Sequence, residues 1–284
     1  MQSLITLKRF CVLCFILPFL TSCGVNAYTP LTQDDNASSF SPQDNPIFFP
    51  CESENDPLFW DLSQTDISQI DQTKKLISFT FDDAPKPSLE PILAVFASFN
   101  EENPDYKATA TLFCNGCFFN NATLHTVKAA HALGWELGNH AFSHVDLTKL
   151  SKSELLLEID KTDELLSRID GKPRHLFRPP FGEISDEIKT AVDVPVINWT
   201  IDTKDWTGRP ADKIYDEIMQ KKFSGAIVLM HDGHYETVHA LKRLLPDLKA
   251  QGYQVTSVSQ MAKAHNCSLK KGGVYVRARK NGTK

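Results

Sequence analysis

Four residues of this sequence have the types and spacing of a metal site. Asp82 and Asp83 directly follow the apolar run Leu76–Phe81, and two adjacent carboxylates repel each other unless a metal ion or a base neutralises one. His140 and His144 are four residues apart, so their side chains would point the same way if the segment is helical. With one carboxylate they would form a set that leaves coordination positions open, as in zinc hydrolases and non-haem iron oxygenases. Taken alone, the acid pair is better explained as a solvated turn, and the histidine pair as two unrelated surface residues.

Three further polar motifs each follow an apolar run. Arg178 precedes two prolines, a phenylalanine and a glycine, and such a rigid turn would fix the arginine and direct a backbone N–H. The other two motifs are Asp202–Trp206, which contains Asp205, and Leu229–Asp232, which contains His231. Because all five motifs follow predicted strands, their order argues against coincidence.

Short apolar runs alternate with helical patterns from Lys75 onward, which predicts βα units around a parallel sheet. Ser151 and Glu154 form a capping box at the start of one predicted helix. This alternation predicts an α/β fold, a distorted (β/α) barrel with about seven parallel strands and the site at their carboxyl ends. The strands are predicted near 76–81, 108–113, 136–138, 175–177, 194–200, 226–230 and 254–257. The helices are predicted at 88–99, 121–133, 151–169, 184–191, 210–221 and 235–250.

The five motifs, taken in order, resemble those of the polysaccharide deacetylases, the chitooligosaccharide-deacetylase homology domain of carbohydrate esterase family four. The resemblance covers roughly residues 75–265, so we place a deacetylase domain at 74–266. It implies that Asp83, His140 and His144 bind one divalent metal, Zn2+ or another such as Co2+. The matching segments are Thr80–Asp83, His140–His144, Arg178–Phe181, Asp202–Trp206 and Leu229–His231.

The resemblance also implies catalytic roles for four other polar residues. Asp82 corresponds to the general base that deprotonates a water molecule, and Arg178 to the residue that pairs with this base. An adjacent arginine keeps a carboxylate ionised, which suits that role. His231 corresponds to the general acid that protonates the leaving amine, and Asp205 would hold its imidazolium.

Three residues are expected to contact the substrate. The backbone N–H of Phe181 would stabilise the oxyanion, while Trp206 and Leu229 would form an apolar slot for the acetyl methyl group. The expected substrate is an N-acetylated polysaccharide, most readily peptidoglycan or a chitin-like glycan. An O-deacetylase of the acetylxylan-esterase type and a catalytically silent glycan-binding lipoprotein are the alternatives. An iron oxygenase would leave Arg178 and Asp205 without a task.

The first residues read as an export signal, with a lipobox that ends at residue 23. Lys8 and Arg9 precede the apolar segment Phe10–Leu20, which is too short to span a bilayer. Cys23 stands at the lipidation position of bacterial lipoproteins, whereas cleavage after Ala27 would release a secreted protein. We therefore expect signal peptide 1–23, an envelope location, and a membrane anchor through a lipid on Cys23.

Charge and composition separate the chain into an acidic body and a basic end. The 284 residues contain 30 Lys+Arg and 35 Asp+Glu, a net charge of −5. When Lys8, Arg9 and the six Lys and Arg of residues 268–284 are left out, 22 basic and 35 acidic residues remain, a net charge of −13. A body this acidic predicts no nucleic-acid partner. We expect residues 24–73 to form a tether or wrap, and the basic tail 267–284 to hold the protein near an anionic envelope.

Four cysteines follow the leader: Cys51, Cys114, Cys117 and Cys267. An even number in an exported chain predicts disulfides, although the sequence does not choose among the three pairings. Because no second CxxC motif follows the leader, a zinc knuckle at Cys114–Cys117 is disfavoured.

Overall fold

The computed structural model describes residues 57–278. The predicted signal peptide, Cys23, Ala27 and Cys51 lie outside this range. Among the described residues, no helix is long and apolar enough to cross a membrane.

The main sheet is parallel and is built around its longest strand, β1 (Lys75–Ala84). Its strand order is β3-β2-β1-β6-β5, and a further strand, β7, pairs with the first half of β1. The other strands are β2 (Thr111–Cys114), β3 (Glu136–Asn139), β5 (Ile201–Asp202), β6 (Ile227–His231) and β7 (Tyr253–Thr256).

The sheet curves into an irregular closed barrel. Phe177 forms parallel bridges with Asn139, at the end of β3, and with Val196, in β4 (Val196–Ile197). Four residues after Ile197 the chain enters β5, which pairs with β6. The predicted distorted (β/α) barrel is therefore confirmed, but its fourth strand consists only of bridges at Phe177, and the fifth is divided into β4 and β5.

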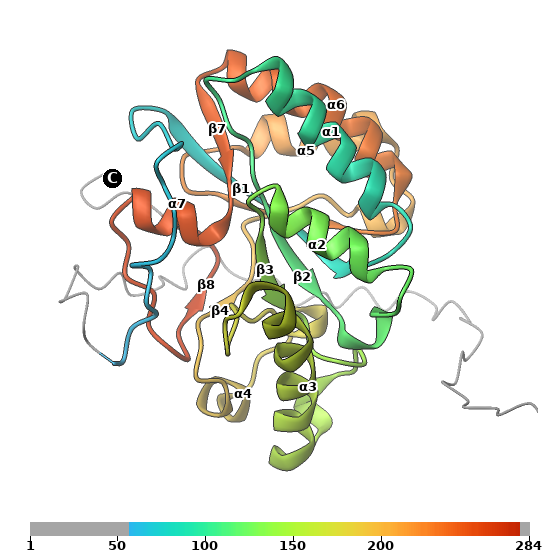
Figure 1. Cartoon of the computed structure of the whole chain (residues 1–284), viewed down its shortest axis with the longest axis vertical. Coiled ribbons are helices and arrows are strands. Elements are labelled where there is room, and N and C mark those ends of the chain that lie inside the picture. The colour runs from blue at the N-terminus through green and yellow to red at the C-terminus, as the bar shows by residue number, and fades with distance from the viewer. Residues whose placement is uncertain (1–56, 279–284) are drawn as a thin grey trace, which may run out of the picture. The chain divides into compact units, whose positions relative to one another are not determined.

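The helices surround the sheet in an order that matches a βα barrel. Neighbouring helices pack in the series α5, α6, α1, α2, α3 and α4 (Figure 1). Ser151 and Glu154 form the predicted capping box at the start of α3. The helices are α1 (Leu89–Glu102), α2 (Leu124–Ala132), α3 (Lys152–Asp170), α4 (Asp186–Ala191), α5 (Ala211–Lys221), α6 (Tyr235–Ala250) and α7 (Val258–Ala264).

Alternation along β1 separates the packing layer from the polar interior. Ile77, Phe79 and Phe81 are buried in the main hydrophobic cluster, together with residues of α1 and α6. Thr80 and Asp82 point to the opposite side because side chains alternate along a strand. Each buried phenylalanine contributes about 1.5–3 kcal/mol, so β1 is a rigid base for the polar residues at its carboxyl end.

Segments on both sides of the predicted domain belong to the folded body. The N–H of Trp60 donates to the carbonyl of Leu269 at 2.7 Å, and Ile70 and Leu269 are buried. The short strand β8 (Val274–Tyr275) pairs with β4, and Ala278 is buried. Residues 267–278 are thus part of the fold, not of a free tail, and the last three predicted tail cations lie beyond the described residues.

The cysteine prediction is wrong at one position. Cys114 is fully buried and carries a thiol, whose Sγ lies 3.7 Å from the carbonyl oxygen of Leu112. Burial raises the pKa of this thiol well above its ordinary value. A disulfide through Cys114 is therefore absent, because the end of β2 packs this side chain into the core as a small apolar group.

Candidate active site

The predicted metal ligands lie together at the carboxyl ends of β1 and β3. The ligand atoms of Asp83, His140 and His144 all lie within 4.8 Å of one another. The Nε2 atoms of His144 and His140 are 3.2 and 3.7 Å from Asp83 Oδ1. The structure therefore brings together the three residues that the sequence predicted.

The two histidines converge although the segment that carries them is not helical. Residues 140–146 form an irregular bend, in which Ala141 and His144 have positive φ angles of 63° and 55°. Asp83 also has a positive φ, 63°. Such conformations cost about 1–3 kcal/mol each in non-glycine residues and persist only where surrounding structure enforces them. The helical condition attached to the HxxxH spacing is not met, yet the two side chains do converge.

His140 is held in one tautomer. Its Nδ1 lies 2.7 Å from the carbonyl oxygen of Arg178, which can only accept, so Nδ1 carries the proton and donates. In the neutral ring Nε2 is therefore the atom with the lone pair, and it faces Asp83. His144 is partly buried against the Phe181 ring, 4.8 Å away between ring centroids, and burial lowers the pKa of His144. Both rings can therefore present a lone pair to a cation.

The two oxygens of Asp83 have different surroundings. Oδ2 accepts a hydrogen bond from Lys86 Nζ at 2.9 Å, whereas Oδ1 is buried and has no hydrogen bond within the described part of the chain. Burial raises the pKa of Asp83, but His140, Lys86 and His144 outweigh it and bring the pKa down to about 2. An ionised, orphaned oxygen facing two imidazole nitrogens is a donor set that zinc or cobalt fits.

Asp82 is buried beside this group and forms an ion pair with Arg178. Arg178 Nη1 lies 2.6 Å from Asp82 Oδ1 and 2.7 Å from Thr80 Oγ1. The remaining guanidinium nitrogens donate to the carbonyls of Ile197 and Asn198 at 2.8 and 3.1 Å. Burial lowers the pKa of Arg178, and the charge of Asp82 opposes this effect. Four acceptors thus hold the arginine so that one nitrogen faces Asp82.

Phe113 and Gly138 support this arginine, and the sequence did not identify either. The Arg178 guanidinium lies over the Phe113 ring, 4.2 Å from its centroid. A Cβ at Gly138 would lie 2.6 Å from Phe113 Cδ1, so a larger residue there would displace the ring. No motif signals these roles, because they depend on contacts between neighbouring strands.

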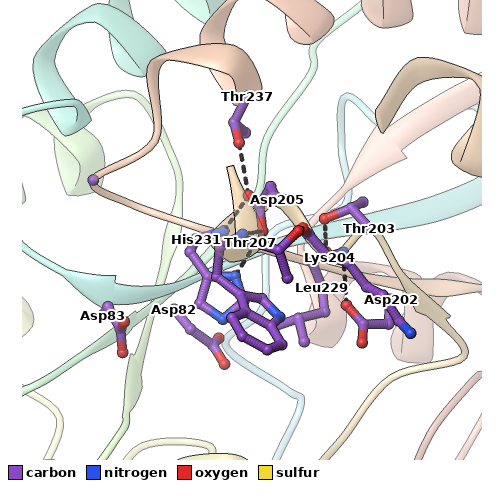
Figure 2. A network of polar contacts seen from close by, with 12 residues as sticks. Asp82, Asp83, Asp202, Thr203, Lys204, Asp205, Thr207, Leu229, His231 and Thr237 are labelled. Carbon is purple, nitrogen blue, oxygen red and sulfur yellow. Dashed lines mark hydrogen bonds and ion pairs between the residues drawn. The ribbon is translucent and has the colours of Figure 1, made fainter. Parts of the chain in front are cut away.

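His231 and Asp205 form the second polar pair of the site. His231 Nδ1 is 2.8 Å from Asp205 Oδ1, and the other oxygen accepts from the His231 N–H at 2.8 Å and from Thr237 Oγ1 at 2.6 Å. Figure 2 shows His231 between this carboxylate and the acids at the end of β1, in agreement with the register that places Asp82 opposite His231. The hydrogen bond fixes Nδ1 as the donor, so Nε2 is directed away from Asp205.

The electrostatics of this pair favour a protonated imidazole. Burial lowers the pKa of His231, but the hydrogen bond and charge of Asp205, with the charges of Asp82 and Asp83, raise it above the ordinary value. Burial raises the pKa of Asp205, and its bonds to His231 and Thr237 bring it below the ordinary value. The pair therefore favours a proton on His231.

The predicted substrate contacts differ in exposure. Phe181 and Trp206 are 61% and 53% exposed, and Leu229 is buried on β6 two residues before His231. Phe181 has a φ of 61°, and its exposed ring contacts the His144 ring. Tyr235, 56% exposed at the start of α6, is a further aromatic side chain that the sequence interpretation missed.

Asp232 joins the loop after β1 to the end of β6, and the sequence interpretation gave it no role. Its side chain accepts from the N–H of Lys86 and from Ser88 Oγ at 2.6 Å. Its own N–H donates to the carbonyl of Asp82 at 2.9 Å. Burial raises the pKa of Asp232 to about 6. The loop that follows β1 is thus tied to the end of β6, which carries His231.

Comparison with known proteins agrees with this geometry. Residues 69–196 match the family model described as polysaccharide deacetylase. The chain is 33% identical over 195 residues to the peptidoglycan-N-acetylmuramic acid deacetylase PdaC of Bacillus subtilis. This alignment covers 68% of this chain and 40% of that protein. A peptidoglycan-N-acetylglucosamine deacetylase of Bacillus cereus is 33% identical over 202 residues, covering 68% of this chain and 91% of that protein.

A solved structure of the Bacillus subtilis peptidoglycan deacetylase PdaC superimposes with a TM-score of 0.64 at 32% identity, covering 69% of this chain and 94% of that one. A structure of T48 deacetylase with substrate gives a TM-score of 0.66 at 28% identity, covering 72% and 99%. The chain therefore belongs to the polysaccharide deacetylase family. It spans about two fifths of the length of the first curated relatives it matches.

Proposed function

We propose that this chain is a metal-dependent hydrolase that removes N-acetyl groups from an N-acetylated polysaccharide. One observation carries the proposal: the group of Asp83, His140 and His144 lies beside two polar pairs. These pairs are Asp82 with Arg178, and His231 with Asp205. Two proton-handling groups around a cation site are what amide hydrolysis requires.

Asp83, His140 and His144 would hold the ion, either zinc or cobalt. When bound, the ion supplies a Lewis acid and lowers the pKa of a water molecule. Every proton transfer then falls to residues of this chain.

Asp82 is proposed as the general base that accepts the proton of the attacking water. Arg178 pairs with this carboxylate and directs it, through the contact of 2.6 Å. His231 is the proposed general acid, since its raised pKa favours the protonated ring that a leaving amine needs. Asp205 accepts the Nδ1 proton of the ring, so the second proton of the imidazolium, the transferable one, lies on Nε2.

Substrate contacts are proposed at the rim of the site. The N–H of Phe181 would stabilise the developing oxyanion, and Trp206 and Leu229 would bound the acetyl methyl group. Peptidoglycan is the proposed glycan, supported by the named substrates of the two bacillar relatives. An O-deacetylase remains the second candidate, because the same residues can hydrolyse an ester. Intact Asp82 and His231 argue against a catalytically silent glycan-binding protein.

We also propose that the protein acts outside the cytoplasm, in the bacterial envelope. The predicted signal peptide 1–23 and the named activities of its relatives on peptidoglycan support this location. A lipid on Cys23 would anchor the chain through the segment that follows.

Product analysis on a panel of acetylated glycans tests the proposal. We expect acetate and free amino sugars from peptidoglycan or chitin oligomers, and less acetate from O-acetylated xylan. Release from xylan alone would favour the O-deacetylase, and no release from any member of the panel would favour the silent binding protein.

A further inference from the structure

Lys86 contacts the metal-binding carboxylate from the side opposite the histidines. Its Nζ lies 2.9 Å from Asp83 Oδ2, whereas Asp83 Oδ1 lies 3.2 Å from His144 and 3.7 Å from His140. One carboxylate thus has a cation on one oxygen and the proposed ion site at the other. Lys86 is outside the five sequence motifs, and the proposed catalytic mechanism gives it no task.

Contacts around Lys86 hold it in this place. Its N–H donates to Asp232, and Ser88 Oγ donates to the same carboxylate at 2.6 Å. A Cβ at Gly233 would lie 2.9 Å from Lys86 Cδ, so the lysine stem packs closely over a glycine that has a φ of 106°. Nζ also lies over the Phe118 ring, 5.4 Å from its centroid. The ammonium therefore has a built position, unlike that of a solvated surface lysine.

We propose that Lys86 lowers the affinity of the site for its divalent ion by neutralising the charge of Asp83. The inference rests on the proposed metal site. Asp82 is already paired with Arg178, and Asp83 with Lys86, so each acid has its own cation. The negative charge of Asp83, which would attract a divalent ion, is therefore already balanced by Lys86.

The size of the effect follows from the distances. The ammonium touches one carboxylate oxygen and the ion would touch the other, so the two cations would be within about 7 Å of each other. At an effective dielectric constant between those of a protein surface and of water, the repulsion corresponds to about tenfold in affinity or more. Lys86 also donates a hydrogen bond to Asp83, and losing that bond would lower the metal affinity. A neutral side chain at position 86 that still donates a hydrogen bond therefore isolates the effect of the charge.

Equilibrium binding of zinc and cobalt to metal-free protein tests the proposal, with a chromophoric chelator as competitor. Lys86→Gln removes the charge but keeps an N–H donor, and we expect it to bind both ions about tenfold more tightly than wild type. Lys86→Arg keeps the charge and should bind like wild type. Lys189→Gln is the matched control, because Lys189 also pairs with an aspartate three residues earlier, Asp186 on α4, and its affinity should not change.

The outcomes separate this inference from the proposed function. Unchanged or weaker binding by Lys86→Gln, with wild-type melting behaviour, would overturn the charge effect while the metal site stands. Tighter binding by Lys86→Arg as well would overturn it too, since the charge is retained. If wild type binds neither ion, or if His140→Ala binds them equally well, the proposed metal site itself is wrong.

Discussion

Replacing Arg178 by methionine should destabilise the protein strongly, because it leaves a buried carboxylate without its partner. The guanidinium is fully buried and donates to Asp82, to Thr80 and to the carbonyls of Ile197 and Asn198. Removal of one partner from a buried ion pair costs about 3–5 kcal/mol. Methionine retains most of the side-chain length, so lost packing adds little to this value.

The loss should be measured by thermal and urea unfolding of chelator-treated protein, because a bound ion would stabilise the folded state. For a domain of this size about 1 kcal/mol corresponds to 2–4 °C, so the melting temperature should fall by roughly 6–20 °C. Arg243→Met is the matched control. Its ion pair with Asp212 is exposed, so its loss should cost less than about 1 kcal/mol.

A second variant identifies the cause of the loss. Arg178→Met combined with Asp82→Asn removes both charges, so the double variant should be more stable than Arg178→Met alone. The reasoning is refuted if Arg178→Met costs less than about 1 kcal/mol, or if the second substitution destabilises the protein further.

Three other predictions concern single groups. Asp82→Asn should bind zinc nearly as well as wild type but lose turnover, and an equal loss of bound zinc would mean that the roles of the two adjacent acids are exchanged. His231→Ala should slow hydrolysis of amides more than of activated esters, since an amine leaves poorly unless protonated, and turnover should fall as pH rises through the raised pKa of His231. Burial lowers the pKa of His175, but its hydrogen bonds to Asp163 and Asp170 raise this pKa above the unfolded-state value. The protonated ring therefore stabilises the fold below about pH 6.5, and this stabilisation is lost as pH rises through the folded-state pKa. His175→Gln should therefore cost more stability at pH 6 than at pH 9 in urea unfolding, and an equal cost at both would contradict this.

Sequence reasoning predicted the parts of the site that lie on one strand end. Asp82 and Asp83 end β1, and His231 ends β6, because period-two apolar runs mark strands and parallel strands gather their carboxyl ends at one edge. The start of the helix after Ser151 was also predictable from the sequence, because its capping box is a local signal. These features depend on residues close in the sequence.

What the sequence did not predict depends on contacts between distant segments. The bend that brings His144 to Asp83 uses left-handed residues that no local pattern marks. Phe113 becomes important only because the barrel places it under Arg178, and Asp232 because it bridges two loops. The basic charge of the segment beyond residue 266 predicted a tail, yet Leu269 and Ala278 in this segment are buried.

The most direct test of the proposed mechanism is acetate release from peptidoglycan during titration of metal-free protein with zinc or cobalt. We predict no release without the ion and a rise in proportion to occupancy, which saturates at one ion per chain. Asp83→Ala should abolish that response, because it removes the carboxylate that faces both histidines. Full acetate release from metal-free protein, or a response that Asp83→Ala leaves intact, would contradict the assignment of this group as the catalytic metal site.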